Sequence, residues 1–267
     1  LRLDPATGLP IEYRLRLKGP LKYPPVVYTY PRGAAGNDEI YIIQHGDSLC
    51  CIEAETLLQL WSEELGFGVA AAPAVSERTI YVTAEGGRIN TFRKENRSLG
   101  WTHSAGRSVS ASPVLSGDML YMASEDGNVY ALNALSGWVN GRSWIGKTKA
   151  RIKTRPVVYQ QRVFAASHDC FLYAFDANDG NVAWKFATGR IVNDQPYACS
   201  DTVFCLADDL QNGERTLYAV SSTNGKPRWK RTVSGMDGKT YDEPGVPGVG
   251  AFICPGSKLV YVLAKNA

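Results

Sequence analysis

Two adjacent cysteines, Cys50 and Cys51, are the residues that most suggest chemistry, because a neighbouring pair can form a redox-active disulfide. They lie within residues 46–56 (GDSLCCIEAET), a stretch whose pattern is typical of a β-strand. Neighbouring side chains in a strand point to opposite faces, so the two sulfur atoms should diverge. We therefore expect Cys50 and Cys51 to be structural residues rather than a redox pair.

The other residue types that carry chemistry also lack a catalytic or metal-binding arrangement. His45, His103 and His168 lie far apart in the sequence and lack metal-ligand spacing. Asp176 and Asp179 lie around the turn at residues 177–180 and are expected as turn residues rather than calcium ligands. No phosphate-binding loop, dinucleotide fingerprint or nucleophile elbow is present. The sequence therefore predicts no catalytic, cofactor-binding or metal-binding residues, and a protein that is not an enzyme.

Charge and composition narrow the classes of partner. The formal net charge is only +3 and no block of like charges occurs, which argues against nucleic acid. No apolar stretch approaches the roughly 18 residues that cross a membrane, so we expect no direct membrane insertion. The six cysteines show no CxxC spacing, which argues against a zinc site and a dense disulfide scaffold.

Tryptophan and proline recur with a common period of about 40 residues. The tryptophans are spaced by 40, 43, 40 and 45 residues, and the prolines by 40, 43 and 40. The two series are Trp61, Trp101, Trp144, Trp184 and Trp229, and Pro73, Pro113, Pro156 and Pro196. Two independent markers with one period indicate an internal repeat of the propeller or solenoid kind, with tryptophan as the apolar filler between repeats.

Each repeat contains four short strands separated by turns. Residues 112–115 (SPVL), 119–123 (MLYMA) and 128–133 (NVYALN) are expected as the first three strands, and the fourth surrounds Trp144. The next repeat follows the same order from residue 155 to residue 186. No segment of 10–15 residues carries a helical period, so the chain is predicted to be all-β.

Four segments give the repeat a family resemblance: residues 126–137 (DGNVYALNALSG), 171–186 (FLYAFDANDGNVAWKF), 217–229 (LYAVSSTNGKPRW) and 3–8 (LDPATG). They resemble the pyrroloquinoline-quinone-like (PQQ-like) repeat, whose form is roughly DGxLYALDAxTGxxxWxF. The resemblance implies a β-propeller in which each four-stranded antiparallel sheet forms one blade. It extends to the bacterial outer-membrane assembly lipoprotein and to the propeller of the beta-alanine-activating enzymes, which residues 167–173 (SHDCFLY) resemble.

The spacing predicts five complete blades and two fragments within one propeller domain spanning residues 1–267. Residues 1–19 are expected to supply the third and fourth strands of a further blade, with the fourth at 11–17. Residues 247–265 are expected to supply its first and second strands, at 248–254 and 259–264. These fragments favour a six-bladed ring whose last blade is closed by both ends of the chain. The alternative is a part of a seven- or eight-bladed ring.

A group of basic residues recurs in the loops that join the fourth strand of one blade to the first strand of the next. Arg107 and Arg190 lie six residues before the repeat proline, and Arg151 lies five residues before it. Lys149, Lys153 and Arg155 add to the middle loop. We call these six residues the basic arc and predict that they bind an acidic partner segment or an anionic ligand at one mouth of the central channel.

The function predicted from the sequence is a non-catalytic protein-interaction scaffold, acting as a subunit or domain of a larger assembly and using its loops and channel mouth. The alternative is a PQQ-dependent quinoprotein dehydrogenase or a fragment of one, because the resemblance includes enzymes with an adjacent cysteine pair against the cofactor. Their calcium ligands are not evident here, so no cofactor is predicted. The resemblance implies an extracytoplasmic location, whereas unpaired cysteines favour a reducing compartment.

Overall fold

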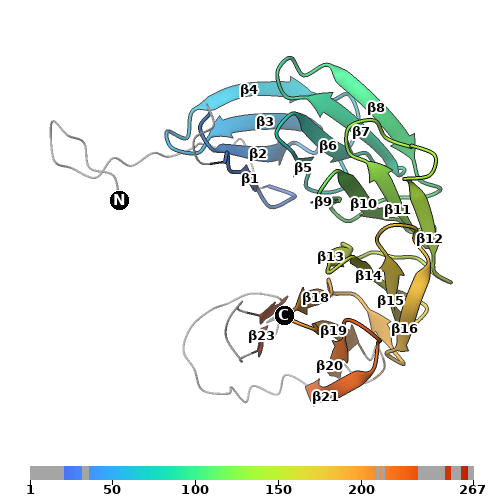
Figure 1. The fold of residues 1–267 in the computed structure, drawn as a ribbon. Coiled ribbons are helices and arrows are strands. Elements are labelled where there is room, and N and C mark those ends of the chain that lie inside the picture. The colour runs from blue at the N-terminus through green and yellow to red at the C-terminus, as the bar shows by residue number, and fades with distance from the viewer. Residues whose placement is uncertain are drawn as a thin grey trace, which may run out of the picture.

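The computed structural model describes residues 21–31, 36–208, 211 and 214–233, together with the backbone of residues 250–253 and 260–263. All regular elements in this part of the chain are β-strands, arranged along an arc (Figure 1). The first three sheets contain β1 (Val26–Tyr28), β2 (Glu39–Gln44), β3 (Ser48–Glu53), β4 (Gln59–Glu64); β5 (Ala74–Val75), β6 (Thr79–Thr83), β7 (Arg88–Arg93), β8 (Leu99–Ser104); and β9 (Val114–Ser116), β10 (Met119–Ala123), β11 (Asn128–Asn133), β12 (Trp144–Lys147). The next two contain β13 (Val157–Tyr159), β14 (Arg162–Ser167), β15 (Phe171–Asp176), β16 (Val182–Ala187); and β17 (Ile191–Val192), β18 (Tyr197–Cys199), β19 (Thr202–Asp208), β20 (Arg215–Ser221), β21 (Pro227–Val233). A last antiparallel pair contains β22 (Gly250–Ile253) and β23 (Val260–Leu263).

The predicted blades are confirmed as antiparallel meanders in which neighbouring strands are consecutive in the chain. The strands predicted at 119–123 and 128–133 appear with those bounds as β10 and β11. In the fifth sheet both β17 and β18 pair with β19, so the first strand of that blade is split in two. β22 and β23 lie where the first two strands of the closing blade were predicted, whereas the strand predicted at residues 11–17 lies outside the described residues.

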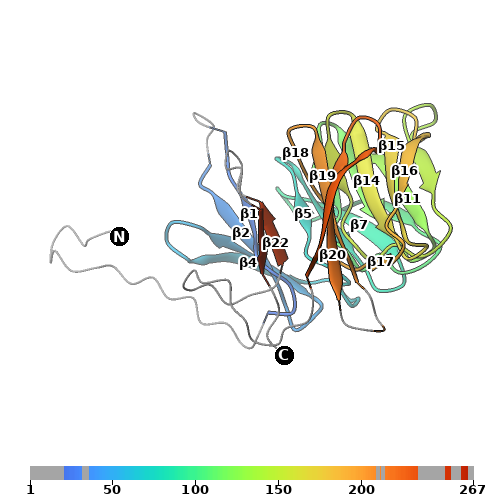
Figure 2. The ribbon, with the colours of Figure 1, turned by 90° about the horizontal axis from the view of Figure 1, so that it is seen from below.

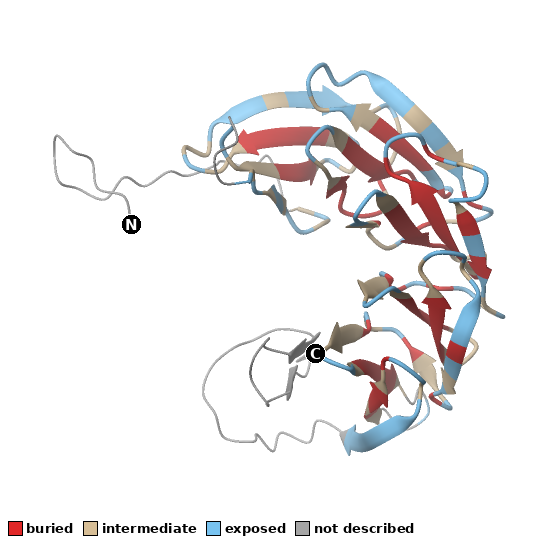
Figure 3. Ribbon diagram, in the orientation of Figure 1, coloured by how far each residue is buried: buried red, intermediate tan, exposed pale blue. Residues whose placement is uncertain are grey.

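The strands occupy different depths within each blade. First strands of adjacent blades contact one another along the concave side of the arc, and the outer strands β4, β8, β12, β16 and β21 follow its convex side (Figures 1 and 2). The two middle strands of each blade carry the core, while the outer strands are largely exposed (Figure 3). Each blade packs its apolar faces against the blades beside it, which is why one blade cannot be stable alone.

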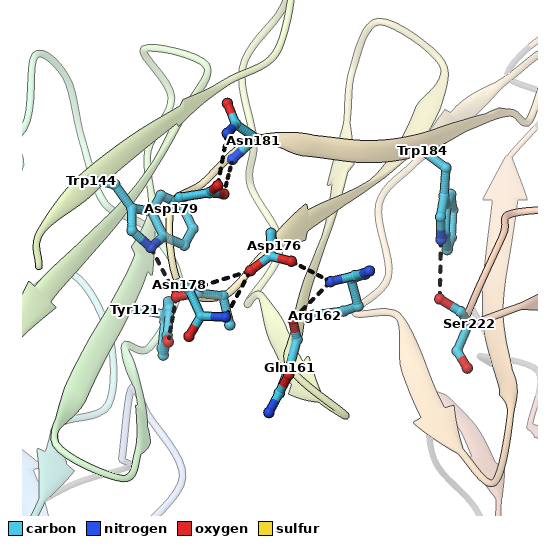
Figure 4. Close-up of polar contacts among 11 residues, drawn as sticks. Tyr121, Trp144, Gln161, Arg162, Asp176, Asn178, Asp179, Asn181, Trp184 and Ser222 are labelled. Atoms are coloured by element: carbon cyan, nitrogen blue, oxygen red, sulfur yellow. Dashed lines mark hydrogen bonds and ion pairs between the residues drawn. The ribbon is translucent and has the colours of Figure 1, made fainter.

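The predicted tryptophans join consecutive blades through a polar contact as well as by filling space. The indole Nε1 of Trp144 on β12 donates a hydrogen bond to the carbonyl of Ala177 in the next blade (2.9 Å), and Trp184 on β16 donates to Ser222 (3.0 Å; Figure 4). Trp101 on β8 donates in the same way to Ala134 (3.1 Å). We call this arrangement the indole–turn contact.

A glycine with a positive φ angle lies three residues after each of these acceptors and faces the indole ring. A Cβ atom added to Gly180 (φ +73°) would lie only 2.4 Å from the nearest ring carbon of Trp144. Gly137 and Gly225 occupy the same position against Trp101 and Trp184. The recurrence of Ser-Gly and Asn-Gly or Asp-Gly turns in the sequence therefore reflects contact with the preceding blade as well as turn conformation.

The contact between the first two blades differs, because an ion pair lies within it. The Lys94 ammonium is 2.5 Å from a Glu39 carboxylate oxygen, and these side chains are only 9% and 16% exposed. The ammonium also lies 4.0 Å from the ring centre of Tyr28. Tyr41 donates a hydrogen bond to Glu39 (2.7 Å), and its burial raises its own pKa. Both charges are therefore satisfied by groups that have been removed from water.

We predict that Gly180→Ala destabilises the fold by about 2–4 kcal/mol, since it adds a clash with Trp144 to the cost of a positive φ angle in alanine. The matched control is Gly117→Ala, because Gly117 (φ +60°) has open space around its missing side chain. The control should lose only about 1 kcal/mol. Urea denaturation followed by circular dichroism measures both losses, and equal losses would contradict the role of the indole.

We also predict that Lys94→Met destabilises the fold by about 3–5 kcal/mol, because it leaves the Glu39 carboxylate largely buried without its partner. The double variant Lys94→Met/Glu39→Gln should recover a substantial part of that loss. Arg142→Met is the control, since its ion pair with Asp118 is exposed and should be worth less than about 1 kcal/mol. A double variant no more stable than Lys94→Met would show that the pair does not govern this contact.

Candidate partner-binding surface

The basic arc lies on three consecutive interblade loops. Arg107 is in the loop between β8 and β9, and Arg190 is between β16 and β17. The other four residues of the arc, Lys149, Arg151, Lys153 and Arg155, are between β12 and β13. Arg190 is half-buried and the other five are exposed. Each loop leads from the outer strand on the convex side of one blade to the first strand on the concave side of the next blade. Each loop therefore crosses one edge of the blades.

An aspartate in the hairpin of the following blade fixes each of the first two loops. Asp126 accepts a hydrogen bond from the backbone N–H of Gly106 (2.8 Å), and Asp169 accepts one from the N–H of Lys149 (2.9 Å). The same aspartates accept hydrogen bonds from Tyr130 (2.5 Å) and Tyr173 (2.7 Å). Each loop thus has a fixed backbone next to its basic side chains.

The carboxylate of Asp126 is held in its charged form by these contacts. Its partial burial by itself raises the pKa, but the hydrogen bonds from Tyr130 and from the N–H groups of Asn128 and Gly106 outweigh burial and lower it. The charged aspartate therefore binds the loop backbone.

Serine hydroxyl groups of the same hairpins hold the loop carbonyls. Ser124 donates a hydrogen bond to the carbonyl of Arg107 (3.0 Å), and Ser167 donates to that of Ala150 (3.1 Å). The N–H of His168 donates to the carbonyl of Arg151 (3.0 Å). The backbone carbonyls of Arg107 and Arg151 are therefore bound to the next blade.

His168 lies beside Arg151 in the middle of the basic arc, whereas the sequence indicated only that it lacks metal-ligand spacing. Arg151 Nε donates a hydrogen bond to His168 Nδ1 (3.1 Å), which requires that nitrogen to be unprotonated. Burial lowers the pKa of His168, and the charges of Arg151 and Lys153 lower it further. An interaction with Asn193, which lies between β17 and β18, acts in the opposite direction.

Most cations of the arc have no carboxylate partner within the described part of the chain. There Arg107, Lys149, Lys153 and Arg155 form no ion pair, whereas nearby Arg215 pairs with Asp194 and Asp208. A guanidinium stays charged at neutral pH, so Arg107 and Arg155 keep their charge there. These side chains can therefore bind an anionic group without first breaking an internal pair.

The residues that first suggested chemistry occupy structural positions. Cys50 packs with Ile42 and Ile52, whereas Cys51 packs in the separate cluster that contains Tyr41, so the predicted divergence of the two side chains is confirmed. Both are free thiols, and burial raises the pKa of Cys51 to about 11.

The aspartates at 176 and 179 are turn residues, as predicted. Asp176 accepts a hydrogen bond from the Asn178 N–H (3.0 Å) and Asp179 accepts one from the Asn181 N–H (2.9 Å; Figure 4). In residues 21–31, 36–208, 211 and 214–233 no group of three His, Cys, Asp or Glu side chains is placed to hold a metal ion. No helix in the described part of the chain is long and apolar enough to span a bilayer.

One cleft was not foreseen from the sequence. It has a volume of about 1030 Å³ and is lined by residues of three blades, among them Tyr30, Lys94, Leu99, Trp101 and Leu135. Its residues are far apart in the chain and of mixed type, so no motif could have indicated it. None of the six residues of the basic arc lines it.

Comparison with solved structures supports the propeller fold. The crystal structure of BamB from Moraxella catarrhalis superposes with a TM-score of 0.61 and 19% identity, covering 72% of this chain and 57% of that chain. A computationally designed protein, Ika8, superposes with a TM-score of 0.55 and 11% identity, covering 74% of this chain and 72% of that one. At these identities the likeness shows the fold alone, and it confirms the predicted β-propeller.

Curated relatives share one segment with the chain. The beta-alanine-activating enzymes of Homo sapiens and Mus musculus are 31% and 33% identical over 86 residues. That segment is 32% of this chain and only 7% of either enzyme.

The family model described as outer membrane protein assembly factor BamB matches residues 25–230 and, in an overlapping match, residues 140–263. These matches include every blade in the described part of the chain. The protein therefore belongs to this family of PQQ-like repeat propellers.

Proposed function

We propose that the protein is a non-catalytic interaction scaffold that binds an acidic segment of a partner protein through the basic arc. The observation that carries the proposal is that the backbone and the cationic side chains of the interblade loops have separate roles. Asp126 and Asp169 bind the loop backbone, while the cationic side chains beside them remain without carboxylate partners among the described residues. Prearranged charges of this kind favour fast and selective association with an acidic surface.

Family membership supports the wider part of the proposal. The family's description refers to an assembly factor, so we propose that this chain also acts as part of a multiprotein assembly. A rigid array of blades with several exposed loops suits that role, because binding residues on loops are positioned by the scaffold below them.

The quinoprotein alternative has less support. Its most suggestive feature is the pair Cys50–Cys51, and these side chains are buried in different clusters. We therefore propose a role without a quinone cofactor and without redox chemistry at this pair.

The first prediction of the proposal concerns affinity for an acidic peptide. The triple variant Arg107→Ala/Arg151→Ala/Arg190→Ala should bind a fluorescein-labelled peptide of alternating glutamate and leucine at least about tenfold more weakly than the parent chain, because three favourable charges are lost. Fluorescence anisotropy at about 0.15 M salt measures the affinity. A peptide with glutamine in place of glutamate should bind neither protein.

The matched control removes three arginines outside the loops. Arg142, Arg228 and Arg231 are exposed residues on the 138–143 turn and on β21, and their replacement by alanine changes the net charge by the same amount. If the two triple variants bound the acidic peptide equally weakly, the loss of affinity would be due to net charge alone. That result would refute a specific site.

The second prediction concerns thiol reactivity. N-ethylmaleimide at pH 8 should label the half-buried Cys170 and Cys199 in the native protein and leave Cys50, Cys51 and Cys205 unlabelled. Burial raises the pKa of Cys51 to about 11 and that of Cys205 to about 12, so almost none of either thiol is ionised at that pH. Peptide mapping by mass spectrometry identifies the labelled residues. A Cys50–Cys51 disulfide, or a tight complex with PQQ and calcium that shows a quinone absorbance, would favour the quinoprotein alternative.

A further inference from the structure

His168 holds a position at which the second and third blades have a glutamate. The equivalence follows from one repeated hydrogen bond between hairpin and interblade loop: the N–H of Glu85 donates to Gly68 (2.8 Å), that of Glu125 to Ser108 (2.9 Å) and that of His168 to Arg151 (3.0 Å). A glutamate carries a negative charge at neutral pH, whereas a histidine is either neutral or positive there. The fourth blade therefore places beside the basic arc a group whose charge can change near neutral pH.

The contact between His168 and Arg151 exists only while the imidazole is neutral. Arg151 Nε donates to His168 Nδ1 at 3.1 Å, so Nδ1 offers its lone pair and the ring proton lies on Nε2. A protonated imidazole has an N–H at both nitrogens and cannot accept this hydrogen bond. Protonation must therefore break the contact and set two positive groups against each other, unless an anion enters between them.

The charged groups around His168 come from three segments. They are Arg151 and Lys153 in the loop before the fourth blade, Asp169 in its own hairpin and Glu125 in the hairpin of the third blade, while the uncharged Asn193 lies between β17 and β18. Asp169 is already bound to the loop backbone. Burial lowers the pKa of His168, Arg151 and Lys153 lower it further, and Asn193 and Glu125 act in the opposite direction. In the free protein the imidazole is therefore neutral at pH 7.

An anionic group bound at the arc reverses this balance. Its negative charge offsets the charges of Arg151 and Lys153 and so favours the protonated form of His168. Protonation changes Nδ1 from an acceptor to a donor, and the Nε–H of Arg151 is a second donor beside it. Two nitrogen donors that lie 3.1 Å apart in the free protein suit the two oxygens of one carboxylate.

We infer that His168 is a further ligand-binding residue of the basic arc: it takes up a proton when an acidic partner segment binds, and one carboxylate of that segment accepts hydrogen bonds from both His168 Nδ1 and Arg151 Nε. The inference rests on the proposed function and adds a proton to it. Since the bound state holds more protons than the free state, affinity rises as the pH falls below 7. The site therefore holds an acidic partner more tightly in a mildly acidic environment.

Isothermal titration calorimetry tests the proton uptake, with an unlabelled peptide of alternating glutamate and leucine at about pH 6 in two buffers of different ionisation enthalpy. The difference between the two heats gives the number of protons taken up per peptide bound. The parent chain should take up at least about 0.3 proton, and its affinity should be at least about threefold higher than at about pH 7.5. His168→Gln should take up almost none, because glutamine does not titrate and the peptide carboxylates are already ionised.

The matched control is His45→Gln. His45 is an exposed residue of the hairpin between β2 and β3 and does not belong to the basic arc, and its replacement removes the same kind of titratable group. This variant should take up as many protons as the parent chain. Equal uptake by the parent chain and His168→Gln would overturn the inference and leave the proposed function intact, whereas a failure of all three proteins to bind the peptide would refute both.

Nuclear magnetic resonance provides a second measurement in the unmodified protein. The imidazole C–H signals of His168 are assigned by their loss in His168→Gln, and their pH titration gives the pKa of this group with and without peptide. The peptide should bind the protonated form about tenfold more tightly, so the pKa should be clearly higher in its presence. An unchanged pKa of His168 at saturating peptide would overturn the inference.

Discussion

The hydrogen bond from an indole on one blade to a turn carbonyl on the next is the interaction on which the rest of the structure depends. A four-stranded blade has two apolar faces and cannot bury either one by itself, so its stability comes from its neighbours. The contact sets both the distance and the rotation between blades, because the carbonyl must meet Nε1 while the glycine lies against the ring. Trp101, Trp144 and Trp184 satisfy these conditions with donor–acceptor distances of 3.1, 2.9 and 3.0 Å.

The same repetition determines what the loops can do. Once the blades are fixed, the loops after β8 and β12 lie over the hairpin of the following blade, where Asp126 and Asp169 bind their backbone. Buried side chains such as Val109 and Ile152 anchor the loops in the core, whereas the exposed cationic side chains take no part in these backbone contacts. The exposed positions can therefore vary between blades without disturbing the blade packing. The concentration of cations in the loop at residues 148–156 is such a variation, and it is the part of the surface most able to distinguish one ligand from another.

Sequence periodicity was sufficient for the blades but not for the contacts between them. Residues 128–133 alternate as a strand must, and their bounds are those of β11. The divergence of Cys50 and Cys51 also followed from strand geometry. By contrast, the ion pair of Lys94 with Glu39 joins residues 55 positions apart. Lysine and glutamate are also residue types that are common in exposed turns, so neither one indicates a buried pair. The hydrogen bond from Arg151 to His168 likewise joins two separate segments, an interblade loop and the hairpin of the next blade. Such pairings arise from the packing of separate segments, which local pattern does not encode.

In the other contacts glycine has two roles: it adopts a positive φ angle and it lets the indole approach closely. The first two blades show that these roles are distinct. Leu57 and Arg97 occupy the glycine position and still have positive φ angles of 56° and 60°. Their N–H groups make the same turn bonds, to Glu53 (2.9 Å) and Arg93 (2.8 Å), so the turn itself requires the angle. Glycine is needed only where an indole lies flat against the turn. At Arg97 the guanidinium is 5.7 Å from the ring centre of Trp61, and that tryptophan stays half-buried. The Lys94–Glu39 pair then provides the cohesion that the indole provides elsewhere, which explains why a costly pair of largely buried charges occurs at this contact and not at the other three.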